Sequence, residues 1–79
     1  MEVEGAVHWK TSTFLKTQEK LKRSGDLRWR SADKSRYYTW DSMHGEIEVF
    51  NRRGKHIAVL NANGTLSNKQ PKQGRTIDD

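Results

Sequence analysis

The sequence predicts an α+β fold that is mostly β: a small, twisted antiparallel sheet of about four strands, preceded by one short helix. Three segments, 36–40, 46–50 and 56–60, are rich in the aromatic, β-branched and aliphatic residues that favour strands. Turn sequences that end in glycine, 51–54 and 61–64, follow the second and third of these segments. Strands joined by such short connections must run antiparallel, so we expect a meander.

The helix is expected over about residues 12–24. Ser12 or Thr13 can cap its first turn, and Gly25 can close its last. Its apolar residues are few: Phe14, Leu15 and Leu21. A short helix with so narrow an apolar stripe is marginal alone, so it must dock on another element.

The remaining segments complete a single expected domain over residues 1–79, because a chain of this length leaves room for only one. Residues 26–34 are polar and basic around Trp29, which predicts a loop with a brief extended piece. The sheet is expected over about 28–67, and the polar tail 68–79 is expected to be irregular.

The charge distribution indicates a polyanionic partner. The chain carries 15 basic and 10 acidic residues, and four of the acids lie near its two ends. The interior is therefore strongly basic, which is typical of proteins that bind nucleic acid. Each basic side chain taken alone is equally consistent with a solvated surface. The residues expected to contact the nucleic acid are Arg28, Arg30, Arg36, Arg52, Arg53, Lys55 and Lys72.

The absence of cysteine excludes a disulfide framework, a thiolate metal site and a cysteine nucleophile. Residues 1–10 lack the basic and apolar regions of a signal peptide, and we expect no membrane-spanning segment. His8 and His56 stand alone in the sequence and are interpreted as structural or surface residues.

A cluster of titratable residues extends from the end of the first predicted strand into the second. Alternation along a strand places His44, Glu46 and Glu48 on one face, and Ile47 and Val49 on the other. Asp41, expected in the turn before them, can accept a hydrogen bond from the His44 ring and raise its pKa. A carboxylate, an imidazole and an arginine supply the base, the acid and the cation that RNA cleavage needs.

Two other interpretations of the cluster stay open. Two glutamates on an exposed strand face commonly form cross-strand ion pairs, here with Arg53 or Lys55, and a lone histidine is commonly structural. A divalent metal held by Asp41, His44 and Glu46 is a weaker alternative, because basic surroundings oppose a cation and the spacing matches no zinc signature.

The segment 38–48 resembles the active-site segment of the cytotoxic ribonuclease domain of the ribosome-inactivating E-type colicins, whose pattern is Tyr-x-Trp-Asp-Ser-x-His-Gly-Glu-x-Glu. All eight specified positions match without a gap. Downstream, the segment 71–77 is similar to the family's Pro-x-x-x-Arg-x-Ile. The family has a longer connection before its tryptophan, its turns are longer, and two residues are inserted here before Pro71.

The resemblance implies a highly twisted antiparallel sheet with a short N-terminal helix, and an enzyme that uses no metal and no cofactor. It implies that Glu48 is the general base, His44 the general acid, Asp41 the residue that orients His44, and Arg75 the cation that stabilises the phosphorane. Glu46 lines the site in the family, and Tyr38 and Trp40 are expected to line it as well.

The function that the resemblance implies is cleavage of small-subunit ribosomal RNA in the decoding centre, which stops translation. Its partners are then the ribosome and an acidic immunity or antitoxin protein, and we expect a monomer when the protein is free. It would act in the bacterial cytoplasm, either delivered as the tip of a larger toxin or produced there beside its antitoxin. The alternative function is a non-catalytic basic module that binds RNA or the ribosome.

Overall fold

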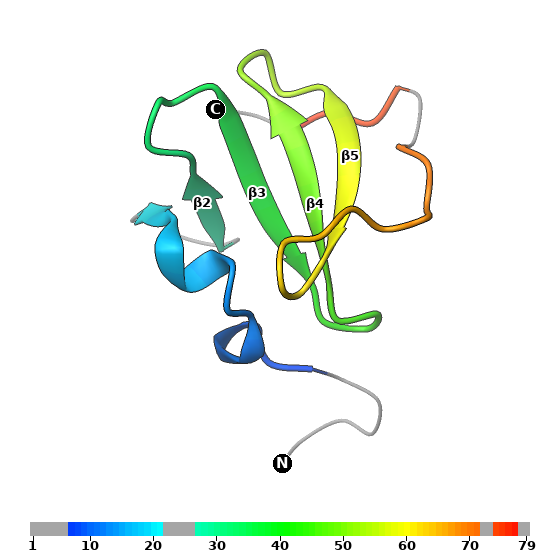
Figure 1. Ribbon diagram of the computed structural model, residues 1–79. Helices are drawn as coiled ribbons and strands as arrows, with labels where there is room; N and C mark the ends of the chain where they lie inside the picture. Colours follow the sequence, from blue (N-terminus) through cyan, green and yellow to red (C-terminus); the bar gives the residue numbers. More distant parts are fainter. Residues whose placement is uncertain (1–6, 22–26, 72–73, 78–79) are drawn as a thin grey trace.

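The computed structural model describes residues 7–21, 27–71 and 74–77. Its main feature is a five-stranded antiparallel sheet in which the strands lie in chain order, as Figure 1 shows. The predicted antiparallel meander is therefore confirmed, with one strand more than the four expected. The strands are β1 (Glu19–Leu21), β2 (Arg28–Arg30), β3 (Arg36–Asp41), β4 (Glu46–Asn51) and β5 (His56–Asn61).

The last three strands match the predicted segments, each with one further residue at its end. The turn at 51–54 joins β4 to β5 through a hydrogen bond from the Gly54 N–H to the Asn51 carbonyl. The turn at 61–64 closes in the same way, from the Gly64 N–H to the Asn61 carbonyl. Gly54 and Gly64 have φ angles of 84° and 91°, which a residue with a Cβ rarely adopts.

The predicted N-terminal helix is wrong. The chain instead forms two short 3-10 turns, η1 (Trp9–Thr11) and η2 (Leu15–Thr17), and then enters β1. The buried Ser12 hydroxyl accepts from the Leu15 N–H and donates to the Ala62 carbonyl, which ties this segment to the far end of the sheet. With so few apolar residues, the segment gains more from packing and strand pairing than from a solvated helix. Residues 22–24 and Gly25 lie outside the described residues.

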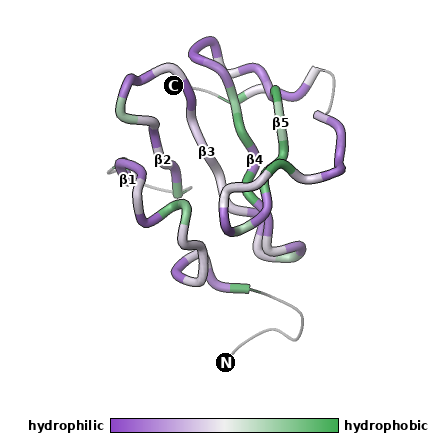
Figure 2. The backbone as a smooth tube through the Cα atoms, in the orientation of Figure 1, coloured by the Kyte–Doolittle hydropathy of each residue, from purple (hydrophilic) through white to green (hydrophobic). Residues whose placement is uncertain are grey.

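The hydrophobic core lies between one face of the sheet and this N-terminal segment. Its buried residues are Leu15, Trp29, Tyr38, Ile47 and Val49. Trp9, Phe14, Trp40, Ala58 and Leu60 pack against them. Figure 2 shows the corresponding hydrophobic stretches along β4 and β5. Residues 28–30, predicted mainly as loop, form β2 because Trp29 fills this core and pairs with Tyr38.

The C-terminal segment lies along the outer edge of β5. Leu66 and Thr76 form isolated antiparallel bridges with Leu60 and Lys55. The His56 N–H donates to the Arg75 carbonyl at 3.0 Å, and the Ile77 N–H donates to the Gly54 carbonyl at 2.9 Å. The described residues of the tail 68–79 are thus irregular, but they are hydrogen-bonded to the sheet. These bonds hold Arg75 beside the first residue of β5.

Candidate functional site

The candidate site is built on the sheet face opposite the hydrophobic core. In the pairing of β3 with β4, Asp41 lies opposite Glu46 and Thr39 lies opposite Glu48. Because side chains alternate along a strand, these four residues share one face. The sequence placed His44 on the same strand, and this is corrected: His44 lies in the turn 42–45, two residues before β4 begins.

Asp41 organises that turn. Its Oδ1 accepts hydrogen bonds from the backbone N–H groups of Met43 and His44, at 3.1 and 3.3 Å. Its Oδ2 lies 2.8 Å from Nδ1 of the His44 ring. The ring is thereby oriented with its Nε2 edge available, and its side chain is 60% exposed. Such an imidazole can exchange a proton with a bound ligand while the carboxylate fixes its orientation.

The electrostatics of Asp41 reflect two opposing effects. Partial burial acts to raise the pKa of this carboxyl group, while hydrogen bonds from the His44 ring and backbone, with the charge of His44, act to lower it. The second effect prevails, so the pKa of Asp41 lies below its ordinary value of 3.8. Asp41 is therefore a carboxylate at neutral pH, as an orienting partner of histidine must be.

Glu48 and Arg75 form the second pair. The Arg75 Nη2 lies 2.6 Å from the Glu48 Oε2, although the residues are far apart in the sequence. The Glu48 side chain is only 13% exposed, and that of Arg75 is 42% exposed. The Glu48 carboxylate is thus largely buried, while the guanidinium of Arg75 is accessible to solvent. An anion bound by Arg75 would lie close to Glu48, which could act as a base.

Glu46 is held by two residues that sequence reasoning missed. Its Oε1 accepts from the Lys69 ammonium at 2.7 Å, and its Oε2 accepts from the Ser67 hydroxyl at 3.3 Å. Both residues come from the segment after β5, whose sequence carries no motif that indicates contact with β4. The C-terminal segment therefore supplies two cations, Lys69 and Arg75, to carboxylates of one strand.

Three of these residues, Asp41, His44 and Glu46, lie close enough together to be considered as ligands of a metal ion. One ligand atom from each of Asp41, His44 and Glu46 lies within 4.8 Å of the others. The Lys69 ammonium, however, already forms an ion pair with the Glu46 carboxylate at 2.7 Å, and Asp41 already engages the histidine Nδ1 at 2.8 Å. The donor set fits an ion-paired polar network better than a divalent site.

The other expected site residues are not all near this face. Tyr38 lies in the core at 4% exposed, and Trp40 packs on the core while its indole N–H donates to the Val7 carbonyl. Both therefore lie on the opposite face from Glu48, which corrects their expected lining role. The face instead carries Tyr37, which strand alternation could have indicated.

The expected RNA-binding residues are also divided. Arg28 is buried, with its guanidinium 6.0 Å from the centre of the Tyr37 ring, so it is no surface contact. Arg30 is engaged by Glu19 at 2.8 Å. Lys72 lies outside the described residues. The side chains that are exposed as expected are Arg36, Arg52, Arg53 and Lys55.

A comparison with protein-family models is decisive for the family. The model described as Cytotoxic matches residues 4–78, nearly the whole chain. The chain belongs to this family. Membership indicates a toxin, and it confirms the coarser part of the resemblance to colicin-type cytotoxic domains. Neither the curated proteins nor the solved structures gave a match. In the part of this cytotoxic domain that the structure describes, no helix is long and apolar enough to cross a membrane.

The close approach of Gly54 to the C-terminal segment gives a first prediction for this cytotoxic domain. A Cβ on Gly54 would clash with the Ile77 carbonyl oxygen, while a Cβ on Gly74 would meet no atom within 4 Å. Both glycines have φ near 80°, so both alanine variants share the backbone strain. Because of the added clash, we expect Gly54→Ala to lower the unfolding free energy by about 1–3 kcal/mol more than Gly74→Ala, in urea denaturation. Equal losses in the two variants would show that the tail does not depend on Gly54.

The lowered pKa of Asp41 gives a second prediction. A carboxyl group whose pKa is lowered on folding stabilises the fold above its unfolded pKa of about 3.9, and loses this as the pH falls through the folded pKa. Hydrogen bonds from Ser35 and Ser31 lower the pKa of Asp33 to about 2, so its contribution to the stability of the fold is also lost as the pH falls. We therefore expect the Tm of the wild type to fall more steeply below pH 4 than that of Asp41→Asn. Parallel Tm curves for the two proteins would contradict this account.

Proposed function

We propose that this cytotoxic domain is a metal-independent endoribonuclease toxin that cleaves small-subunit ribosomal RNA in the decoding centre and so stops translation. One observation supports it most: an aspartate–histidine pair and a glutamate–arginine pair lie on the same sheet face, at 2.8 and 2.6 Å. Together these four residues are the base, the oriented acid and the cation that cleavage of a phosphodiester needs.

In the proposed reaction, Glu48 takes the proton from the 2′-hydroxyl, and the 2′-oxygen attacks the adjacent phosphorus. Arg75 stabilises the charge that develops on the phosphorane oxygens. The bond to the 5′-oxygen breaks, and His44, oriented by Asp41, donates a proton to that oxygen. The products are a 2′,3′-cyclic phosphate and a 5′-hydroxyl, so protons and electrons balance without a metal or cofactor.

The remaining groups are proposed to bind the substrate. Arg36, Arg52, Arg53 and Lys55 are exposed cations, and with Lys72 they would contact phosphates of the RNA. Glu46 lies beside the Asp41–His44 pair and would line the site in its ion pair with Lys69. The formal charge of +5 favours rapid encounter with the ribosome in the bacterial cytoplasm, and with an acidic immunity or antitoxin protein. We propose that the free protein is a monomer.

A second candidate is a basic module that binds RNA or the ribosome without cutting it. It is favoured by the finding that Asp41, Glu46 and Glu48 each have an ion-pair partner, as carboxylates with a purely structural role would. This alternative predicts salt-dependent binding without cleavage products.

The experiment that separates these functions uses bacterial ribosomes and the purified protein in excess chelator. We expect one discrete fragment of the small-subunit RNA on a gel, with the same yield when magnesium is in excess of the chelator. Bound ribosomes with intact RNA would favour the binding module, and cleavage that requires magnesium would contradict the proposed mechanism.

A further inference from the structure

We propose that Trp9, Lys10 and Lys20, the tryptophan–lysine cluster, form a second RNA contact that binds phosphates away from the strand to be cleaved. The choice of RNA as the ligand rests on the proposed function. The Lys10 and Lys20 ammonium groups lie 5.8 and 5.2 Å from the centre of the Trp9 ring. Each is within cation–π range, so two cations from separate segments gather on one indole.

The ring is held in place by the core. Trp9 packs edge-on against Trp29, with their ring centres 5.4 Å apart. Lys20 lies directly opposite Trp29 in the pairing of β1 with β2, which brings its side chain to the same face as Trp9. The cluster is thus preorganised by a fully buried residue, and it does not rely on two freely moving lysines.

The charge of the cluster is not compensated by the described part of the chain. Each acidic side chain described there has another polar partner: Arg30 for Glu19, the serines 31 and 35 for Asp33, His44 for Asp41, Lys69 for Glu46 and Arg75 for Glu48. Two ammonium groups beside one ring repel each other unless an anion lies near both. A polyanion satisfies this requirement, and an aromatic side chain adds a group on which a base can stack.

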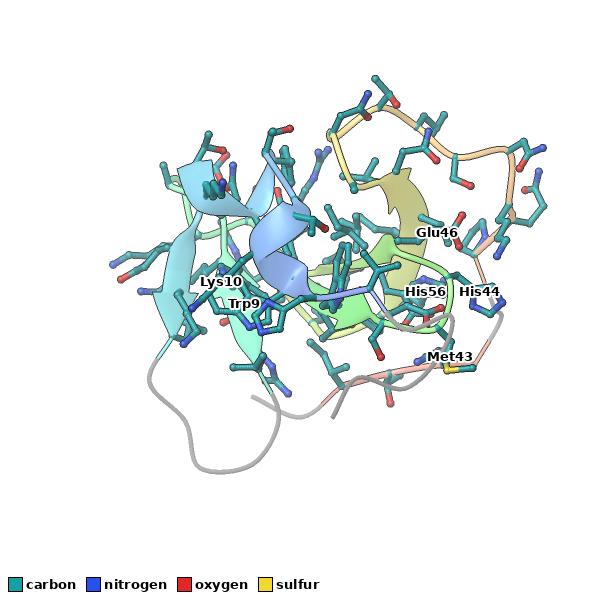
Figure 3. All side chains as sticks on the ribbon, turned by 90° about the horizontal axis from the view of Figure 1, so that it is seen from below. Trp9, Lys10, Met43, His44, Glu46 and His56 are labelled. Atoms are coloured by element: carbon teal, nitrogen blue, oxygen red, sulfur yellow. The ribbon has the colours of Figure 1, made fainter. Side chains whose placement is uncertain are left out.

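The cluster and the candidate cleavage site lie on opposite faces of the sheet. Trp29, which anchors the cluster, shares the core face with Ile47, whereas Glu48 is on the other face. Figure 3 shows Trp9 and Lys10 toward one side of the molecule, and Met43, His44 and Glu46 toward the other. An RNA of two or three nucleotides can therefore occupy the cleavage site without contacting the cluster. A folded ribosomal RNA, which presents several backbones, can contact both.

The test compares Lys10→Gln/Lys20→Gln with a matched control, Lys16→Gln/Lys34→Gln, which removes the same charge from exposed lysines. Binding to bacterial ribosomes is measured over a range of salt concentrations. Loss of two phosphate contacts is expected to reduce the slope of log K against log salt by about 1.4–1.8 in the cluster variant only. Its KM for ribosome cleavage should rise several-fold with kcat unchanged, and cleavage of a short single-stranded RNA should not change.

A salt slope equal in the cluster and control variants would overturn the proposal. The proposal would also be overturned if the cluster variant kept the wild-type salt slope for ribosomes but bound an acidic protein or anionic vesicles more weakly. The cluster would then bind that other partner and not RNA. The binding measurement needs no cleavage, so the cluster can be tested even if the protein proves not to be a nuclease. Trp9→Phe, which keeps an aromatic ring on Trp29, should weaken ribosome binding less than the double lysine change.

Discussion

Replacing Glu48 by glutamine is expected to lower ribosomal RNA cleavage by about 10²–10⁴-fold, the range that a general base contributes. Glutamine keeps the shape of the side chain and can still accept a hydrogen bond from Arg75, but it cannot take the proton of the 2′-hydroxyl. The loss should appear in kcat, because the substituted group acts in the transition state. Affinity for the ribosome, measured by co-sedimentation, should stay within a few-fold of the wild type.

Glu19→Gln is the matched control for this change. Glu19 also forms an ion pair with an arginine, Arg30, at 2.8 Å, but on β1 at the edge of the sheet. Glu19→Gln therefore also removes a carboxylate that is paired with an arginine, but it leaves the proposed site unchanged. If Glu19→Gln and Glu48→Gln reduced kcat equally, or if Glu48→Gln cut ribosomes at the wild-type rate, Glu48 would not be the base.

Replacing Trp29 by alanine is expected to cost about 3–5 kcal/mol of unfolding free energy. Trp29 is 1% exposed, and its ring is the largest fully buried side chain in the described part of the chain. A chain of this length has only about 4–12 kcal/mol of total stability, so much of the population should unfold near physiological temperature. Circular dichroism during urea denaturation measures the loss directly.

Ile57→Ala is the control for the loss of Trp29. Ile57 is also an apolar strand residue, but it is 36% exposed on β5 and lies outside the core cluster. Its replacement should cost less than about 1 kcal/mol. Comparable losses in the two variants would mean that the core is not centred on Trp29.

Much of the sheet could be predicted because its signals are local. Strands β3, β4 and β5 are rich in aromatic or aliphatic residues, and the turns after β4 and β5 each begin with asparagine and end with glycine. The Asp41–His44 pair was predictable for the same reason, since His44 is only three positions after Asp41 across a single turn.

The rest depends on interactions between distant segments. Residues 12–21 have a sequence compatible with a short helix, yet the Ser12 contact with Ala62 and the pairing of Glu19 with Arg30 decide their structure. Lys69 reaches Glu46 only because the chain turns back after β5. The placement of Tyr38 and Trp40 was a missed local signal: alternation from Asp41 already puts them on the other face.

The central proposal is most directly tested by the chemistry of the cut ends. The small-subunit RNA fragment produced in chelator should carry a 5′-hydroxyl, and the other product should end in a 2′,3′-cyclic phosphate. Both ends are required if the 2′-oxygen attacks with Glu48 as base and His44 as acid. A 5′-phosphate on the fragment with a 3′-hydroxyl on the other product would mean that water or a metal-bound hydroxide was the nucleophile, and would contradict the mechanism.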